Sequence, residues 1–108
     1  MAVLAVQKIS QAGLGPAYGA ADALGDEFAN NGRTVLHVKN GSAGAINVTL
    51  DSVKPCDQGF DHDAVVNVPA AGERIIGPFD PARFNNSNGR VGVSYSAAAG
   101  VTVAALET

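Results

Sequence analysis

The chain is poor in cysteine, aromatic residues and basic charge, and it has no long apolar run. Cys56 is the one cysteine among 108 residues, so an internal disulfide cannot form. Small extracellular domains often depend on disulfides, and we therefore expect folding in a reducing cytosol. Tryptophan is absent and aromatic residues make up 6% of the chain, so the core has to come from Val, Ile, Leu and a few Phe side chains.

Charge and hydropathy exclude two classes of partner. The formal net charge is −3, and the seven Lys and Arg residues are scattered along the chain. A nucleic-acid-binding surface needs clustered positive charge to displace counterions from phosphates, so we expect no nucleic-acid partner. No stretch approaches the ~18 apolar residues of a membrane-spanning helix, and residues 1–8 lack the basic start of a signal peptide. We therefore expect no membrane partner and synthesis in the cytoplasm.

What the chain does have is short runs of alternating apolar and polar residues between turns rich in Gly and Asn. Residues 34–38 and 46–50 alternate with a period of two, which is typical of half-buried strands. They flank a turn at 40–44, and we predict that they form an antiparallel hairpin. The same pattern predicts further strands over residues 64–68, 73–77, 91–95 and 101–106, with the last two forming a final pair.

Short strands at this spacing favour an all-β fold. We predict a small antiparallel β-sandwich of the jelly-roll or immunoglobulin-like kind over residues 28–108. One helical turn is predicted at Asp80 and Pro81, because Asp is a good N-cap and Pro a good first helical residue.

Residues 1–27 differ from the rest of the chain. Apart from one short strand predicted at 3–8, this segment is rich in Gly and Ala, and each Gly costs a helix about 1 kcal/mol. We predict an extended N-terminal arm, with Leu14, Tyr18 and Leu24 as isolated anchors, that becomes ordered against a neighbouring molecule.

The one acidic cluster comprises Asp57, Asp61, His62 and Asp63. Carboxylate and imidazole groups are ligands for calcium and zinc. The spacing is not that of an EF-hand loop, however, and no second His or Cys completes a zinc set. We predict a solvated loop that hydrogen-bonds its own backbone, and we assign no metal ligand.

No nucleophile, base or cofactor motif is complete. His37 lies in the middle of a predicted strand without partners at a definable spacing, and we predict a surface or interface histidine. Cys56 lacks a partner base. The glycines at 13–15 are not followed by the Lys-Ser/Thr of a phosphate loop. We therefore assign no catalytic or cofactor-binding residue and no cofactor, and we expect that the chain is not an enzyme.

The aromatic and Asn-rich segments have plain structural explanations. Phe60, Phe79, Phe84 and Tyr95 are too far apart for a nucleic-acid stacking platform and are predicted to fill the core or anchor loops. Residues 85–88, Asn-Asn-Ser-Asn, could hydrogen-bond a sugar, but turn chemistry is the simpler explanation.

Several stretches of the chain together resemble small virion proteins of tailed bacteriophages. They are the run Asn-Asn-Gly-Arg-Thr-Val-Leu-His-Val-Lys-Asn-Gly at residues 30–41, then residues 59–63, 77–85 and 91–96. The resemblance covers about residues 28 to 106 and rests on turn residues and strand pattern. It carries no catalytic residues.

This resemblance implies a non-enzymatic structural protein. The expected function is that of a decoration (cement) subunit, which binds the head shell of a phage and stabilises it. The implied partners are the phage major capsid protein and further copies of the chain, with a trimer favoured, and the implied location is the head surface of the virion. Two alternatives stay open: a head–tail or tail structural component, and a β-sandwich module that binds host glycans.

Overall fold

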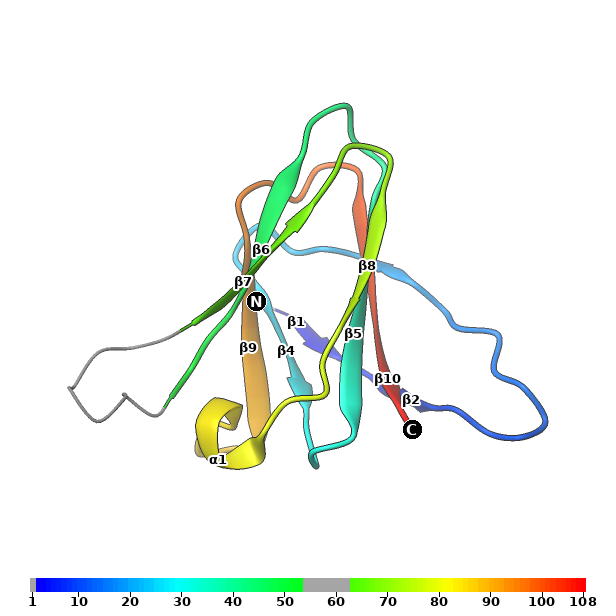
Figure 1. The fold of residues 1–108 in the computed structure, drawn as a ribbon, viewed down its shortest axis with the longest axis vertical. Coiled ribbons are helices and arrows are strands. Elements are labelled where there is room, and N and C mark those ends of the chain that lie inside the picture. Colours follow the sequence, from blue (N-terminus) through cyan, green and yellow to red (C-terminus); the bar gives the residue numbers. More distant parts are fainter. Residues whose placement is uncertain (1, 54–62) are drawn as a thin grey trace.

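The computed structural model describes residues 2–53 and 63–108, which form two facing β-sheets (Figure 1). The strands are β1 (Ala2–Leu4), β2 (Val6–Lys8), β3 (Gly19–Ala20), β4 (Asp26–Ala29), β5 (Thr34–Asn40), β6 (Ile46–Leu50), β7 (Ala64–Val68), β8 (Glu73–Ile76), β9 (Arg90–Tyr95) and β10 (Val101–Glu107). Sheet A has the order β1-β4-β9-β6-β7, and sheet B has the order β2-β10-β5-β8, with β3 also paired to β10. The predicted all-β sandwich is confirmed.

The core lies between the two sheets and is mainly aliphatic. Alternate residues of each central strand face inward, and Leu36 of β5 and Leu50 of β6 are fully buried. Three phenylalanines fill the end of the sandwich near the helix, where the ring of Phe79 lies 5.7 Å from that of Phe28 and 5.4 Å from that of Phe84. Burial of each such side chain stabilises the fold by about 1.5–3 kcal/mol.

The predicted hairpins over residues 34–50 and 91–106 are wrong. Strands β5 and β10 lie in sheet B and pair with each other, whereas β6 and β9 lie in sheet A and pair with each other. The intervening turns are therefore arches that cross from one sheet to the other. A period of two shows which side chains of a strand face the core. It does not show whether two successive strands are neighbours in one sheet or lie in opposite sheets across the core.

A buried asparagine holds these arches together. The side-chain Nδ2 of Asn40 donates to the carbonyl oxygens of Gly44, Val68 and Pro69 at 2.8, 3.2 and 3.2 Å. The Gly41 N–H donates to the carbonyl oxygen of Gly100 at 2.9 Å. The arch after β5 is thereby joined to those after β7 and β9, and all three lie together at the top of Figure 1.

The predicted helical turn is confirmed as α1 (Pro81–Phe84). Asp80 is its N-cap, and its Oδ1 accepts a hydrogen bond from the Ala82 N–H at 3.0 Å. Phe84 anchors the turn because its ring is buried in the core. This short helix is the only one among the described residues, and none there is long and apolar enough to span a membrane.

The N-terminal segment is not an extended arm over its whole length, and this part of the prediction is not confirmed. The predicted strand at 3–8 is broken at Ala5, so that β1 pairs with β4 and β2 pairs with β10. Both pairs are parallel, so the sheets are mixed rather than wholly antiparallel. Leu4 and Val6 pack against the core. Within the described part of the N-terminal segment, residues 9–18 project from the body, as the blue loop on the right of Figure 1.

Candidate functional site

The most distinctive polar cluster lies on the outer face of sheet B. His37 of β5 is out of phase with the inward residues Leu36 and Val38, yet it is only 8% exposed. Tyr18, which ends the projecting loop, covers it: the Tyr18 hydroxyl lies 2.7 Å from His37 Nδ1, and the two rings meet edge to face at 5.3 Å. The prediction of a surface or interface histidine is therefore right about the face of the strand but wrong about exposure.

Two charged side chains complete this cluster. Lys39, two residues along β5, places its Nζ 3.9 Å from the centre of the Tyr18 ring, a cation–π contact. Glu73 of β8 places Oε1 3.5 Å from His37 Nε2. That nitrogen is buried and makes no hydrogen bond within the described part of the chain. We call Tyr18, His37, Lys39 and Glu73 the Tyr18 clasp.

A second contact fixes the same loop. The side-chain amide of Gln7 in β2 both donates to the Ala17 carbonyl and accepts from the Ala17 N–H, each at 2.8 Å. Between this contact and β10 lies a pocket of about 460 Å³ whose lining is mostly aliphatic, including Val3, Leu4, Ala17, Tyr18, Ala104 and Ala105.

The order tyrosine, histidine, glutamate is also that of a nucleophile, a base and an orienting carboxylate. Here, however, Glu73 Oε1 lies 3.5 Å from His37 Nε2, and this nitrogen makes no hydrogen bond within the described part of the chain, so the carboxylate does not orient the imidazole. The contacts therefore best explain a clasp that fastens the loop to sheet B.

Replacing Tyr18 by Phe should loosen this loop. The change removes the partner of a buried imidazole nitrogen, which typically costs about 1–3 kcal/mol. We expect a lower midpoint of thermal unfolding and faster cleavage within residues 9–18 by a broad-specificity protease. In the double variant Y18F/H37F the unpaired nitrogen is gone, so the stability loss should be smaller than the sum of the two single losses. Strict additivity would contradict the clasp.

A second polar contact, between the buried Asp26 and the partly buried Tyr95, lies on the inner face of sheet A. Asp26 of β4 is 0% exposed, and its Oδ2 accepts from the Tyr95 hydroxyl at 2.7 Å and from the Asp22 N–H at 3.2 Å. Burial, reinforced by the hydrogen bond to Asp26, raises the pKa of Tyr95 above its usual range, so the hydroxyl stays protonated. The pair joins β4 to β9 from within the core.

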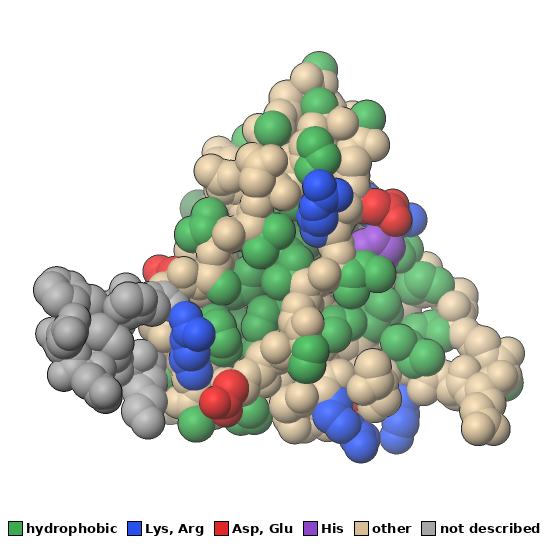
Figure 2. Space-filling model, in the orientation of Figure 1, with side chains coloured by type: hydrophobic (Ala, Val, Ile, Leu, Met, Phe, Trp, Pro, Cys, Tyr) green, Lys and Arg blue, Asp and Glu red, His purple; other side chains and the backbone are tan. Residues whose placement is uncertain are grey.

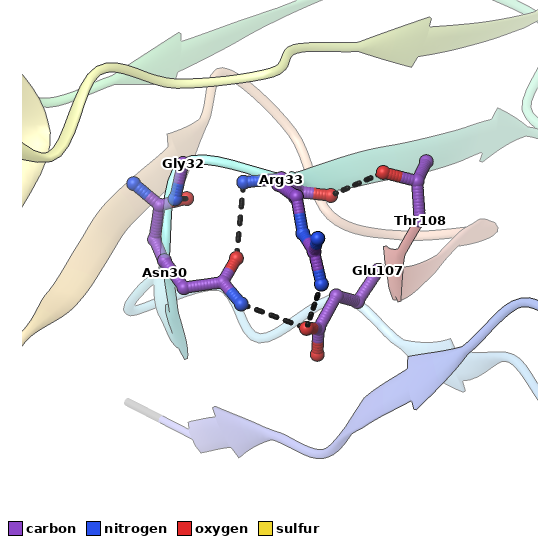
Figure 3. A network of polar contacts seen from close by, with 6 residues as sticks. Asn30, Gly32, Arg33, Glu107 and Thr108 are labelled. Atoms are coloured by element: carbon purple, nitrogen blue, oxygen red, sulfur yellow. Dashed lines mark hydrogen bonds and ion pairs between the residues drawn. The ribbon is translucent and has the colours of Figure 1, made fainter.

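A third polar network lies at the end of the sandwich near the C-terminus (Figure 3). Asn31 Nδ2 donates to Glu107 Oε1 at 2.7 Å, and the Arg33 guanidinium lies 3.8 Å from the same oxygen. The backbone N–H of Thr108 donates to the Arg33 carbonyl at 3.1 Å. These contacts tie the turn between β4 and β5 to the end of β10, which is a structural role.

Only some of the candidate residues from the sequence lie in the part of the chain that the structure describes. Cys56, Phe60 and three members of the acidic cluster, Asp57, Asp61 and His62, lie outside the described residues. Asp63 accepts from the Ser52 N–H at 2.8 Å, as predicted for a loop that bonds its own backbone. In the described ranges 2–53 and 63–108, no three His, Cys, Asp or Glu side chains lie close enough to hold a metal ion.

The Asn-rich turn follows turn chemistry. Asn85 donates from its side chain to the Asn30 carbonyl at 2.8 Å. Asn86 Oδ1 accepts from the N–H groups of Asn88 and Arg90 at 2.9 and 3.2 Å. These side chains are engaged by the protein's own backbone, which supports the simpler explanation over a sugar site.

Three of the six exposed large apolar side chains among the described residues lie on edge strands of the sheets. Leu24, in the turn before β4, is 79% exposed, and Ile75, Val65 and Val3 are 66%, 60% and 56% exposed. The last three belong to β8, β7 and β1, which are edge strands of sheets B, A and A. Figure 2 shows hydrophobic side chains on the face of the molecule that β7 and β8 border.

Comparisons with known proteins found no relative: no family model, curated protein or solved structure matches this chain.

Proposed function

We propose that the chain is a non-enzymatic structural protein of a phage virion, which binds the head shell as a decoration subunit and stabilises it. Its partners in this proposal are the major capsid protein and further copies of the chain. The proposal begins from the resemblance of residues 28 to 106 to small virion proteins. One structural observation carries it further: exposed apolar side chains on edge strands of both sheets, where neighbouring subunits can cover them.

The polar groups of the described residues support a structural role as well. The side chains with candidate chemistry, such as His37, Tyr95 and Asn85, are bonded to other parts of the same chain. They hold loops and arches in place. A compact body of this kind can bind weakly at each contact and still cover a shell firmly, because many copies act together.

The proposal is tested on heads of the encoding phage that lack this protein. Purified chain added to such heads should sediment with them, and a cryo-EM map should show it at regular positions on the shell. Density at the portal or along the tail would replace the decoration role by the head–tail or tail alternative. Binding to host polysaccharide without binding to heads would favour the glycan-binding module.

A charge placed on the exposed apolar turn should weaken shell binding. Leu24→Asp introduces a carboxylate at a side chain that is 79% exposed, so folding should be unaffected while an apolar contact is lost. We expect at least about a tenfold loss of affinity, since burying one Leu contributes about 1.5–3 kcal/mol. Ser87→Asp, at an exposed loop position, is the matched control and should bind as the unchanged protein does.

A further inference from the structure

The edge strand β7 differs from the other edges of the sandwich. Its sequence, Ala-Val-Val-Asn-Val, has no charge, Gly or Pro, and at five residues it is longer than β1, β2, β3 or β8. Proteins usually protect sheet edges with charges, prolines or very short strands. Strand β8 follows that rule, since it carries Glu73 and Arg74. An uncharged edge of this length is suited to pairing with another strand.

The backbone groups that β7 offers can be identified from the ladder. Residues of β6 bond alternately to its two neighbours, and Asn47 bonds to β9, because its carbonyl accepts from the Ser96 N–H at 2.9 Å. Asn47 lies opposite Asn67, and Thr49 lies opposite Val65. These are therefore the non-hydrogen-bonded pairs of the β6–β7 ladder. The N–H and C=O groups of Val65 and Asn67 point away from β6, toward the open edge.

We propose that β7 pairs with β7 of a second copy of this chain, antiparallel about a two-fold axis through Val66. In this register Val65 of each strand lies opposite the partner's Asn67. Each of these two residue pairs exchanges both of its N–H···O bonds, so every outward backbone group of Val65 and Asn67 is used. If the axis passed through Val65 or Asn67 instead, that residue would pair with its own copy. The other residue would then lie opposite a position outside β7 of the partner.

The side chains agree with this register. Val66 is half-buried and faces the core, so it meets the partner's Val66 across the axis and both become covered. On the outer face, Val65 lies beside the partner's Asn67, which is oriented by a bond from its Nδ2 to Asn47 Oδ1 at 3.1 Å. An uncharged strand opposes no like charge when it meets itself.

The neighbouring edge of sheet B carries one charge of each sign. Strand β8 follows β7 through a short turn and borders the same side of the molecule (Figure 1). A two-fold axis perpendicular to sheet A brings both β8 strands to the same boundary. Each carries Glu73 and Arg74, so residues of opposite sign can face each other there. The inference does not rest on the virion role, since it concerns only copies of this chain.

Oligomeric state and hydrogen exchange of the full chain test the proposal. Light scattering after size exclusion should show a dimer that dissociates on dilution. The amide protons of Val65 and Asn67 should exchange more slowly as the concentration rises, whereas that of Val66, which bonds to β6, should not change. A monomer at millimolar concentration, a trimer, or exchange at Val65 and Asn67 that is independent of concentration would overturn the proposal.

A proline at an outward position separates pairing from folding. Asn67→Pro removes an N–H that no bond within sheet A uses, so the ladder to β6 is kept, and dimer affinity should fall at least about tenfold. Asn67→Ala is the matched control: it loses the side chain but keeps the N–H, and should still dimerise. Val65→Lys places a charge on the edge and should also give a monomer. Dimers that persist in both N67P and V65K would refute the assignment to β7.

Discussion

Deleting residues 2–8 should lower the thermal unfolding midpoint of this protein by roughly 10–20 °C. The deletion removes β1 and β2, and with them the half-buried Leu4 and Val6. Their burial contributes about 2–3 kcal/mol, and each kcal/mol moves the midpoint of a domain of this size by roughly 4–8 °C. The deletion also exposes the edges of β4 and β10, so aggregation at high concentration should increase. Circular dichroism melts and light scattering measure both effects.

The matched control changes the neighbouring loop and leaves the two strands in place. Replacing residues 10–16 by a Gly/Ser linker of equal length keeps β1, β2 and the Tyr18 clasp, and should shift the midpoint by only a few degrees. If the truncated and the intact protein instead have the same unfolding midpoint, the pairing of the N-terminal segment with both sheets contributes nothing to stability. The segment would then be the independent arm that composition predicts.

Gly25→Ala should be among the most damaging single substitutions. Gly25 has φ +97°, and a Cβ there would lie 2.8 Å from the carbonyl oxygen of Val93 in β9. Such backbone strain costs about 1–3 kcal/mol, and the overpacking adds about 1–3 kcal/mol. We expect the free energy of unfolding in urea to fall by the sum of the two. Gly25 precedes β4 directly, so the β4–β9 ladder should open first, and hydrogen exchange can detect this.

A second glycine with nearly the same backbone conformation separates the two costs. Gly13 has φ +93° and nothing within 4 Å of the position that a Cβ would take. Gly13→Ala should therefore show the backbone term alone, at most about 1–3 kcal/mol, and the difference between the two variants measures the contact with Val93. Equal losses would mean that the close approach to β9 relaxes without cost.

The candidate functional site was only partly visible in the sequence. The sequence predicts Tyr18 as an anchor of a Gly-rich segment and His37 as a surface or interface histidine. Their contact could not be foreseen, because it joins a loop to a strand 19 positions away. It also depends on β2 lying beside β10, which places Gln7 where it holds Ala17. No spacing rule links these residues.

The sequence by itself determined the fold class, the positions of the main strands and the helical turn. All of these depend on neighbours along the chain: alternation over five to seven residues, Gly and Asn at turns, and the Asp80 cap before Pro81. These preferences act within a few residues, so they can be read without knowing the rest of the molecule.

Strand partners were decided only by the tertiary structure. The arches after β5, β7 and β9 lead from one sheet to the other, although their Gly-rich sequences equally suit hairpins. What selects the arch is a set of distant contacts, such as the bonds from Asn40 to the carbonyls of Val68 and Pro69. The N-terminal strands are a similar case, since β1 and β2 find partners at β4 and β10 that local preference cannot specify. Together with such contacts, the burial of the two inner sheet faces against each other decides which strands pair. This burial involves the whole chain at once, so local preference cannot specify it.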